Sequence, residues 1–405
     1  MSTYHKYFFA ALACFTLAGS TGAFLRFGVL YGMAGLSYAN VRHAHSHLMF
    51  FSWATPAIMA LMAAQLPRLT GRPPGRGLRR VIPVVIVLGL PAWALFMLYG
   101  YGPAQIGGAS VPPAAIAATL CVIAWYVFAA VYFRQLWGAP MTRALWLMNA
   151  AVVFLLLSTL GILGMGARSD NPLVGIALSH VFLDLFTEGW FVLAVLGLAY
   201  AAMPDAGRHP WARISGDMMV VGLPLIFLLL LPVTAVPPSL RWVAGAGGLL
   251  VVLGTLGNII ALWSSTAGTA AGETWSGKAW RVPLVYLAAK CLLLSGLLLP
   301  ATAKWVESVQ LRVPYLHITL LGFVTLGLFA AAERQWGVPG RRWMTLAVTL
   351  LVLSLFPLSG IWPPELGGIW ALHAAACATL GPVLVALALL LFGRKESPAL
   401  PDLTT

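Results

Sequence analysis

Long apolar runs, each followed by a turn-forming segment, dominate this sequence. A run of about 20 apolar residues forms a helix long enough to cross the hydrocarbon core of a bilayer, whereas the strands of a membrane barrel alternate over about ten residues. Only 9% of the 405 residues are charged, which excludes a water-soluble enzyme, a nucleic-acid module and a disordered chain. The sequence therefore predicts an all-α polytopic membrane protein.

Twelve membrane-spanning helices are predicted, and clusters of proline and glycine separate them. They form a single predicted domain over residues 1–393, followed by a short polar tail at 394–405. The expected spans are 7–33, 43–66, 81–100, 112–133, 144–166, 172–202, 217–236, 240–263, 282–302, 312–332, 343–361 and 367–392.

The net charge of +13 is explained by the membrane topology. If the N-terminus is cytoplasmic, the inner segments hold 17 of the 24 Lys and Arg residues, the outer segments hold 5, and the remaining 2, Arg26 and Lys290, lie within spans. Basic residues concentrate on the cytoplasmic side of membrane proteins. We therefore expect both termini in the cytoplasm, a multi-pass protein of the inner (cytoplasmic) membrane in contact with its lipids, and no nucleic-acid partner.

Six of the eight histidines lie in or near four spans that all run from the outer to the inner side. Each lies within about ten residues of the outer end, or about 15 Å along a helix. Neutral imidazole is the commonest metal ligand and an axial ligand of haem iron, although a single histidine in a span often only hydrogen-bonds between helices. The shared depth favours a haem or metal site. The six are His43, His45, His47, His180, His317 and His373.

The second span begins with three of these histidines. His43 and His47 are four residues apart and share a helix face, whereas His45 lies about 200° away on the opposite face. One helix therefore offers imidazole in two directions, as a layer with two adjacent centres would require.

The sixth span carries His180, Asp184 and Glu188 at steps of four residues, which places them on one stripe of an α-helix. Carboxylates at this depth are costly unless they bind a metal, pair with a cation or stay protonated. The stripe predicts a metal site or a proton relay, with a structural hydrogen-bond network as the alternative. Lys290, in the middle of the ninth span, is a candidate partner for these acids.

At these residues the chain resembles the catalytic subunit I of the haem-copper oxidase superfamily, nearest its C-type oxidase and nitric oxide reductase branches. Arg42-x-x-His45-Ser46 resembles the Arg-x-x-His-Thr segment whose histidine ligates the low-spin haem. Tyr315-x-His317 resembles the His-x-His segment, in which the second histidine binds the other side of that haem. The resemblance implies a low-spin b-type haem between His45 and His317, and it places Tyr315 where the family has the ligand of the high-spin haem.

The sixth span resembles the His-x-x-x-Glu-x-x-x-Glu pattern of the reductases, with Asp184 in place of the first glutamate. The resemblance implies that His180 and Asp184 ligate a second centre, which is a second haem or a non-haem iron or copper, and that Glu188 supplies protons. The seventh span lacks the adjacent histidine pair that the family uses for the non-haem metal. The binuclear centre is therefore incomplete.

Three histidines, His43, His47 and His373, have no counterpart in the family. They are candidate metal ligands of a second centre rebuilt from other helices. Arg42 and Arg312, at outer helix ends, are expected to pair with haem propionates, with ordinary interfacial arginines as the alternative.

The resemblance implies haem-based electron transfer, with reduction of nitric oxide or oxygen as the expected reaction and a cytochrome c-like or quinol redox partner. A haem with two histidine ligands has no open iron position, so it transfers electrons and does not bind gas. Three alternatives stay open. The start of the second span also resembles the NnrS-like membrane proteins, which bind haem and copper and are linked to nitric oxide tolerance. A proton or metal-ion transporter would explain Asp184, Glu188 and Lys290 without haem, and a non-catalytic subunit would have lost its centre.

Overall fold

The computed structural model describes residues 2–166, 171–266, 277–309 and 311–393. Within these ranges, twelve helical segments are long and apolar enough to cross a membrane. The predicted all-α polytopic membrane fold is therefore confirmed. The predicted polar tail at 394–405 lies outside the described residues.

The chain groups into two compact units, which we describe one at a time. The first comprises Met1–Gly138, Ala332–Leu358 and Trp362–Thr405, and the second comprises Ala139–Ala331 and Ser359–Ile361. The prediction of a single domain over residues 1–393 stays a prediction.

The first unit contains long helices, short 3-10 and π-helical segments, and one hairpin. Its elements are α1 (Thr3–Tyr31), α2 (Tyr38–Leu48), η1 (Met49–Ala54), α3 (Thr55–Thr70), α4 (Arg76–Tyr99), β1 (Ala104–Ile106), β2 (Ala109–Val111), α5 (Pro113–Leu136), the end of α14 (Leu326–Trp336), α15 (Arg341–Leu355), η8 (Phe356–Leu358), η9 (Pro364–Leu366) and α16 (Ile369–Phe392).

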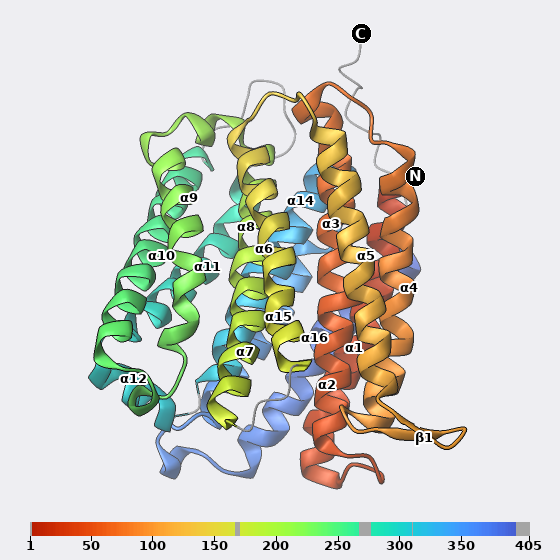
Figure 1. Cartoon of the computed structure of the whole chain (residues 1–405), viewed down its shortest axis with the longest axis vertical. Helices are drawn as coiled ribbons and strands as arrows, with labels where there is room; N and C mark the ends of the chain where they lie inside the picture. Colours follow the sequence, from red (N-terminus) through yellow and green to blue (C-terminus); the bar gives the residue numbers. More distant parts are fainter. Residues whose placement is uncertain (1, 167–170, 267–276, 310, 394–405) are drawn as a thin grey trace. The chain divides into compact units, whose positions relative to one another are not determined.

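Helices α1 and α16 of the first unit pack closely and run antiparallel. A Cβ on Gly19 in α1 would lie 2.7 Å from a methyl group of Val383 in α16, so a glycine is needed at this contact. The Tyr31 hydroxyl at the end of α1 lies 3.2 Å from His373 Nε2 near the start of α16. The end of α1 therefore lies beside the start of α16, as expected for antiparallel helices (Figure 1).

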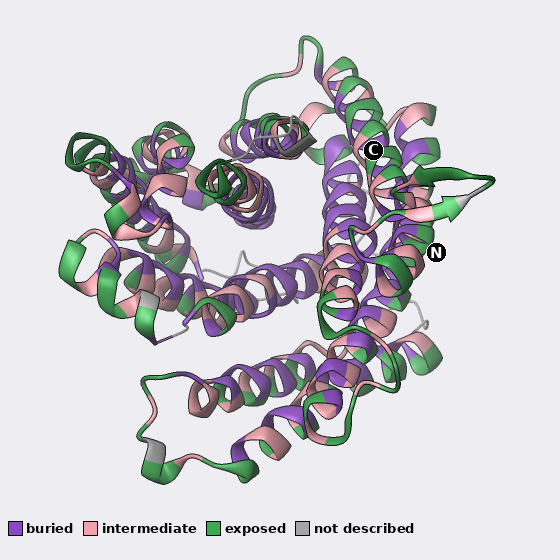
Figure 2. Ribbon diagram, turned by 60° about the horizontal axis from the view of Figure 1, so that its bottom comes forward, coloured by how far each residue is buried: buried purple, intermediate pink, exposed green. Residues whose placement is uncertain are grey.

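The hairpin between α4 and α5 is the one strand pair among the described residues, and the sequence did not lead us to expect it. Ile106 pairs with Ala109 across a two-residue turn formed by Gly107 and Gly108, whose φ angles are 58° and 82°. Positive φ at both central positions is the geometry of the type I′ hairpin turn, which glycine adopts without strain. The hairpin is largely exposed (Figure 2).

The second unit is entirely helical within its described residues. Its elements are α6 (Arg143–Gly166), α7 (Pro172–Asp184), η2 (Leu185–Val192), α8 (Leu193–Ala202), η3 (Pro204–Arg208), α9 (Pro210–Gly222), η4 (Leu223–Leu229), η5 (Val233–Ala235), α10 (Pro238–Ser265), η6 (Gly277–Trp280), α11 (Arg281–Gly296), α12 (Pro300–Ser308), α13 (Arg312–His317), η7 (Ile318–Thr325) and the start of α14.

The seventh span differs most from its expected position at 217–236, because it covers Pro210–Leu229. Pro210 occupies the first turn, where its fixed φ suits a helix and its missing N–H costs nothing. The His209 imidazole caps this turn by accepting a hydrogen bond from a backbone N–H at 3.3 Å. The chain therefore turns into the helix about two turns before the apolar run that defined the expected span.

Small residues let α9 and α10 of the second unit pack backbone against backbone, as Figure 1 shows for these neighbouring helices. A Cβ on Gly254 would lie 2.4 Å from the carbonyl oxygen of Ser215, and one on Gly222 would lie 2.4 Å from the carbonyl oxygen of Gly247. Helices in lipid associate through such close contacts because burying apolar surface gains little there.

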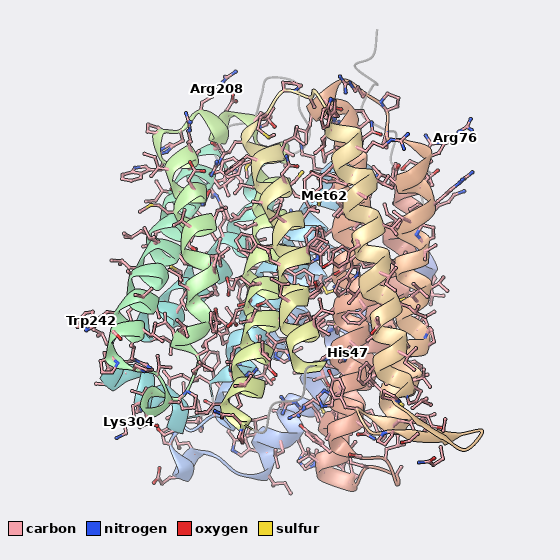
Figure 3. All side chains as sticks on the ribbon, in the orientation of Figure 1. His47, Met62, Arg76, Arg208, Trp242 and Lys304 are labelled. Carbon is pink, nitrogen blue, oxygen red and sulfur yellow. The ribbon has the colours of Figure 1, made fainter. Side chains whose placement is uncertain are left out.

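Residues that the topology prediction assigns to the inner and the outer side of the membrane lie at opposite ends of their unit. In the first unit, Arg76 lies at the end opposite to His47, and in the second unit Arg208 lies at the end opposite to Trp242 and Lys304 (Figure 3). Large apolar residues between the ends are exposed, for example Val84 and Val87 on α4. These side chains contact lipid in a membrane protein.

Replacing Gly254 by alanine tests the α9–α10 contact. We expect a loss of about 1–3 kcal/mol in stability, because the new methyl group meets the backbone of Ser215 and the helices must separate. Thermal unfolding in detergent measures the loss. Gly245→Ala, on the same helix with nothing within 4 Å of its Cβ, is the matched control and should leave the midpoint unchanged or raise it. Equal effects of the two substitutions would contradict the packing described here.

Candidate functional site

Three of the spans that carry histidine change from α- to π-helix directly after the segment with the predicted ligands. The π-helical segments are η1 after α2, η2 after α7 and η7 after α13. In the same spans, 78%, 83% and 78% of an 18-residue stretch is buried, more than in any other span found in the described residues. Turns of π-helix are rare in proteins, and those that occur often lie at functional sites. Helix type and burial therefore distinguish these three spans from the others, independently of their histidines.

A buried carboxylate in η2 is the centre of the second unit's polar interior. Both oxygens of Glu188 accept hydrogen bonds, Oε1 from the Tyr315 hydroxyl at 2.7 Å and Oε2 from the Lys290 ammonium group. The side chains of Lys290 and Glu188 are 0% and 2% exposed. Glu188 and Lys290 thus form a buried ion pair. The predicted role of Lys290 as a partner of the acids is confirmed for Glu188.

Close packing of α11 on η7 brings Lys290 to this acid. The ring of Tyr286 on α11 covers Gly322 of η7, where a Cβ would lie 2.3 Å from the ring. Lys290 follows Tyr286 by four residues, so the two side chains share a face of α11. Tyr315 reaches Glu188 from α13, which directly precedes η7. Three elements therefore each supply one member of the cluster.

His180 and Asp184 form a second polar group on the same span. Their atoms Nδ1 and Oδ2 are 3.7 Å apart, and the side chains are 11% and 10% exposed. Within the described residues, neither of these two buried atoms has a hydrogen-bond partner. Buried polar atoms without hydrogen-bond partners are rare in proteins, so this pair is a candidate binding site for a water, an ion or a proton.

The predicted stripe of His180, Asp184 and Glu188 spans two helix types. Asp184 ends the α-helical part, and Glu188 lies within the π-helical segment, where hydrogen bonds run from residue i to i+5. Asp184 lies beside His180, while Glu188 contacts Lys290 and Tyr315. The two acids therefore have different partners although they lie on the same span.

His45 of the first unit is held by a neighbouring helix. Its Nδ1 lies 2.8 Å from the carbonyl oxygen of Ala18 on α1, so Nδ1 carries the proton and donates it. A Cβ on Gly22, one turn further along α1, would lie 2.8 Å from Cε1 of the imidazole. The ring therefore occupies a space that only glycine leaves, and its Nε2 carries the lone pair. Histidines that ligate metals have this arrangement, with the other nitrogen donating to a carbonyl or a carboxylate.

His47 and His43 belong to an aromatic cluster at one end of the first unit. The His47 ring stacks on Phe96 with centroids 3.8 Å apart, and its Nδ1 donates to the carbonyl oxygen of His43 at 2.8 Å. Tyr101, in the loop after α4, lies 4.8 Å from the His43 ring, and its hydroxyl is 3.4 Å from His47 Nε2. The two imidazole centroids are 6.4 Å apart. These contacts fit a packed cluster, and the sequence did not indicate the contribution of Tyr101.

His373 and His317 each donate Nδ1 to the carbonyl oxygen four residues earlier, Ile369 and Val313, at 2.8 Å. His373 belongs to the first unit with His45, whereas His317 belongs to the second unit with His180. The predicted pairing of His45 with His317 joins residues of two different units and stays a prediction.

The two arginines expected at haem propionates are exposed. Arg42 lies in the second turn of α2, and Arg312 is the first residue of α13. Neither side chain is buried within its own unit. Their role stays a prediction.

Within the part of the chain that the structure describes, no three or more His, Cys, Asp or Glu side chains converge on a position where they could hold a metal ion. His180 with Asp184 provides two ligand types at most. The predicted metal ligands His43, His47, His180 and His373 therefore stay candidates.

Neither a scan against protein-family models nor a search of curated proteins finds a match to this chain. The resemblance to the haem-copper oxidases accordingly rests on the short motifs around His45, His180 and His317.

Substitutions at the buried cluster test the pairing of Glu188 with Lys290. Lys290→Met alone should lower stability by about 3–5 kcal/mol, because it leaves a buried carboxylate without its counter-charge. Combining it with Glu188→Gln should cost less than the sum of the single substitutions by about 1–3 kcal/mol. Thermal unfolding of the four proteins in detergent gives the cycle. Additive effects would show that the two groups do not interact.

The space for the His45 ring can be tested at Gly22. Gly22→Ala should cost about 1–3 kcal/mol, because the methyl group meets the imidazole. In a His45→Ala background the same substitution should cost almost nothing, since the ring is gone. Unfolding midpoints measure both, with Gly175→Ala, whose Cβ has nothing within 4 Å, as the control. An equal cost of Gly22→Ala in both backgrounds would contradict the contact.

Proposed function

We propose that this chain is a b-type haem protein of the inner membrane that transfers electrons, with both termini in the cytoplasm and with His45 and His317 as axial ligands. The hydrogen bond from His45 Nδ1 to the carbonyl oxygen of Ala18 carries the proposal. It fixes the ring against Gly22 and presents Nε2 as the ligand atom. His317 has the same tautomer through its bond to Val313.

The residues present fit this group by donor type and by burial. Imidazole nitrogens are standard axial ligands of b-type haem, and both histidines are half-buried in spans that contain π turns. Arg42 and Arg312 each precede a proposed ligand by a few residues at the start of its helix, and they would hold the propionates through charge-assisted hydrogen bonds. A haem with two histidine ligands supplies one-electron transfer.

The role of Glu188 in this proposal is to hold a proton inside the membrane. Its carboxylate is surrounded by the ammonium group of Lys290 and the hydroxyl group of Tyr315. The ion pair and the neutral pair formed when Lys290 gives a proton to Oε2 both bury no net charge, so a proton can move between the two groups within the membrane. Asp184 and His180, with unpaired buried atoms, extend the route along the same span.

The reaction that would use such protons is reduction of nitric oxide or oxygen, as the resemblance to the haem-copper oxidases implies. In that case His180 and Asp184 would bind a second centre, a haem or a non-haem iron or copper, and electrons would come from a cytochrome c-like or quinol partner. The NnrS-like proteins are the related alternative, with a function in nitric oxide tolerance. Their resemblance at the start of the second span requires the same haem chemistry.

A reduced-minus-oxidised absorption spectrum of the purified protein tests the proposal. The wild type should show the sharp bands of a low-spin b-type haem. His45→Ala and His317→Ala should each abolish them, because a haem that loses an axial histidine leaves the low-spin bis-histidine state. His209→Ala, at the capped start of α9, is the control and should leave the bands unchanged. Folded protein that contains no haem after expression with sufficient haem supply would overturn the proposal.

The buried cluster of Glu188, Lys290 and Tyr315 also favours a second function, that of a proton or metal-ion transporter. Ionisable groups inside the membrane commonly mark ion pathways. Proton uptake into vesicles that contain the haem-free protein distinguishes the two functions. Uptake that Glu188→Gln abolishes and that His45→Ala leaves intact would support transport, and its absence would leave the electron-transfer proposal.

A further inference from the structure

A cavity of about 550 Å³ lies at the start of α6, beside the first turns of α9. This volume is typical of small-ligand sites, which have about 300–1,000 Å³. Gly207 lines the cavity, and its neighbour in sequence, Arg208, lies at one end of the second unit (Figure 3). The positive-inside distribution of basic residues assigns this end to the cytoplasmic side. None of the proposed haem or proton-transfer residues lines it.

Polar side chains of the cavity leave a positive charge uncompensated. Asp217 accepts hydrogen bonds at Oδ1 from Arg143 Nη1 at 3.3 Å and from Trp146 Nε1 at 2.9 Å. Arg143 therefore neutralises the one acidic side chain of the cavity wall. The second arginine, Arg213, is exposed and forms no ion pair with any residue that the structure describes. The lining thus carries two cations and one anion.

Arg143 itself has hydrogen-bonding capacity to spare. Its Nη2 lies in the space left by Gly216, where a Cβ would be 1.6 Å away. Its Nε and Nη2 atoms are buried and have no acceptor within the described residues. Leaving such donors unsatisfied is costly, and the positive end of the α6 dipole lies at the same residue. An anion bound close to the start of α6 would be stabilised by the charge of Arg143 and by the helix dipole.

We propose that this cavity binds a phosphate group, carried by the headgroup of an anionic phospholipid or by a free phosphate compound. Arginine recognises phosphate through its planar set of donors, and Arg143 and Arg213 present two of them around one cavity. Trp146 is 38% exposed beside them, as expected of an indole ring at the membrane interface. Basic pockets between membrane helices on the cytoplasmic side bind anionic headgroups.

Native mass spectrometry in detergent tests lipid binding with phosphatidylglycerol as the probe and zwitterionic phosphatidylcholine for comparison. Arg213→Gln should weaken phosphatidylglycerol binding by about fivefold, the effect of losing one cation near an anionic headgroup. Asp217→Asn keeps an oxygen acceptor for Trp146 and removes the negative charge, so it should strengthen binding. Arg208→Gln is the matched control, because Arg208 is exposed at the same end, pairs with Asp205 and lies outside the cavity.

A second arm distinguishes the free phosphate source. Inorganic phosphate should raise the unfolding temperature of the wild type and of Arg208→Gln, but not of Arg213→Gln, if a soluble phosphate compound is the ligand. Equal losses of lipid in Arg213→Gln and Arg208→Gln would show only a general attraction to the basic surface. Equal lipid losses, together with a phosphate effect on unfolding that Arg213→Gln does not remove, would overturn the proposal. Weaker lipid binding in Asp217→Asn would also overturn it, since an anion site must gain from the loss of a negative charge.

Discussion

The interior of the second unit depends on the mutual neutralisation of Glu188 and Lys290. Neither charge alone is tolerable at 2% and 0% exposure, because burying an unpaired ion costs several kcal/mol. Lys290 lies on α11, which packs directly against η7, where Gly322 leaves room for the Tyr286 ring. A glycine on one span thus allows the close approach of the helix that carries the lysine. Tyr315 then occupies the remaining carboxylate oxygen.

The first unit follows the same principle with a neutral group. His45 is fixed by a carbonyl oxygen of α1 and by the missing side chain of Gly22, so its tautomer and direction are set before any ligand arrives. The neighbouring His47 is fixed differently, by its own helix and by the face of Phe96. Two histidines two residues apart therefore have different surroundings. One is held by a neighbouring helix, and the other is packed into an aromatic cluster.

The twelve spans and the partnership of Lys290 with Glu188 could be predicted, because hydropathy and the cost of buried charge act through residue type alone. The Gly107-Gly108 hairpin, the early start at Pro210 and the π-helical segment at Leu185–Val192 could not. Each of these depends on backbone geometry: a turn type, a capping histidine, or a π turn that forms when neighbouring helices pack. The sequence places Tyr315 at the position of a haem ligand of the family. Its contact with Glu188 could not be predicted, because it depends on how separate helical segments pack.

The π-helical segments also set the rotation of each span about its own axis. A single residue corresponds to about 100° of rotation in an α-helix, so an extra residue in the middle turns the following half relative to the preceding one. In the sixth span the half that begins at Leu193 is fully buried, while His180 and Asp184 on the preceding half face each other. A deletion of one residue within Leu185–Val192 would keep the composition and length of the span nearly unchanged. It would nevertheless put the two halves out of phase.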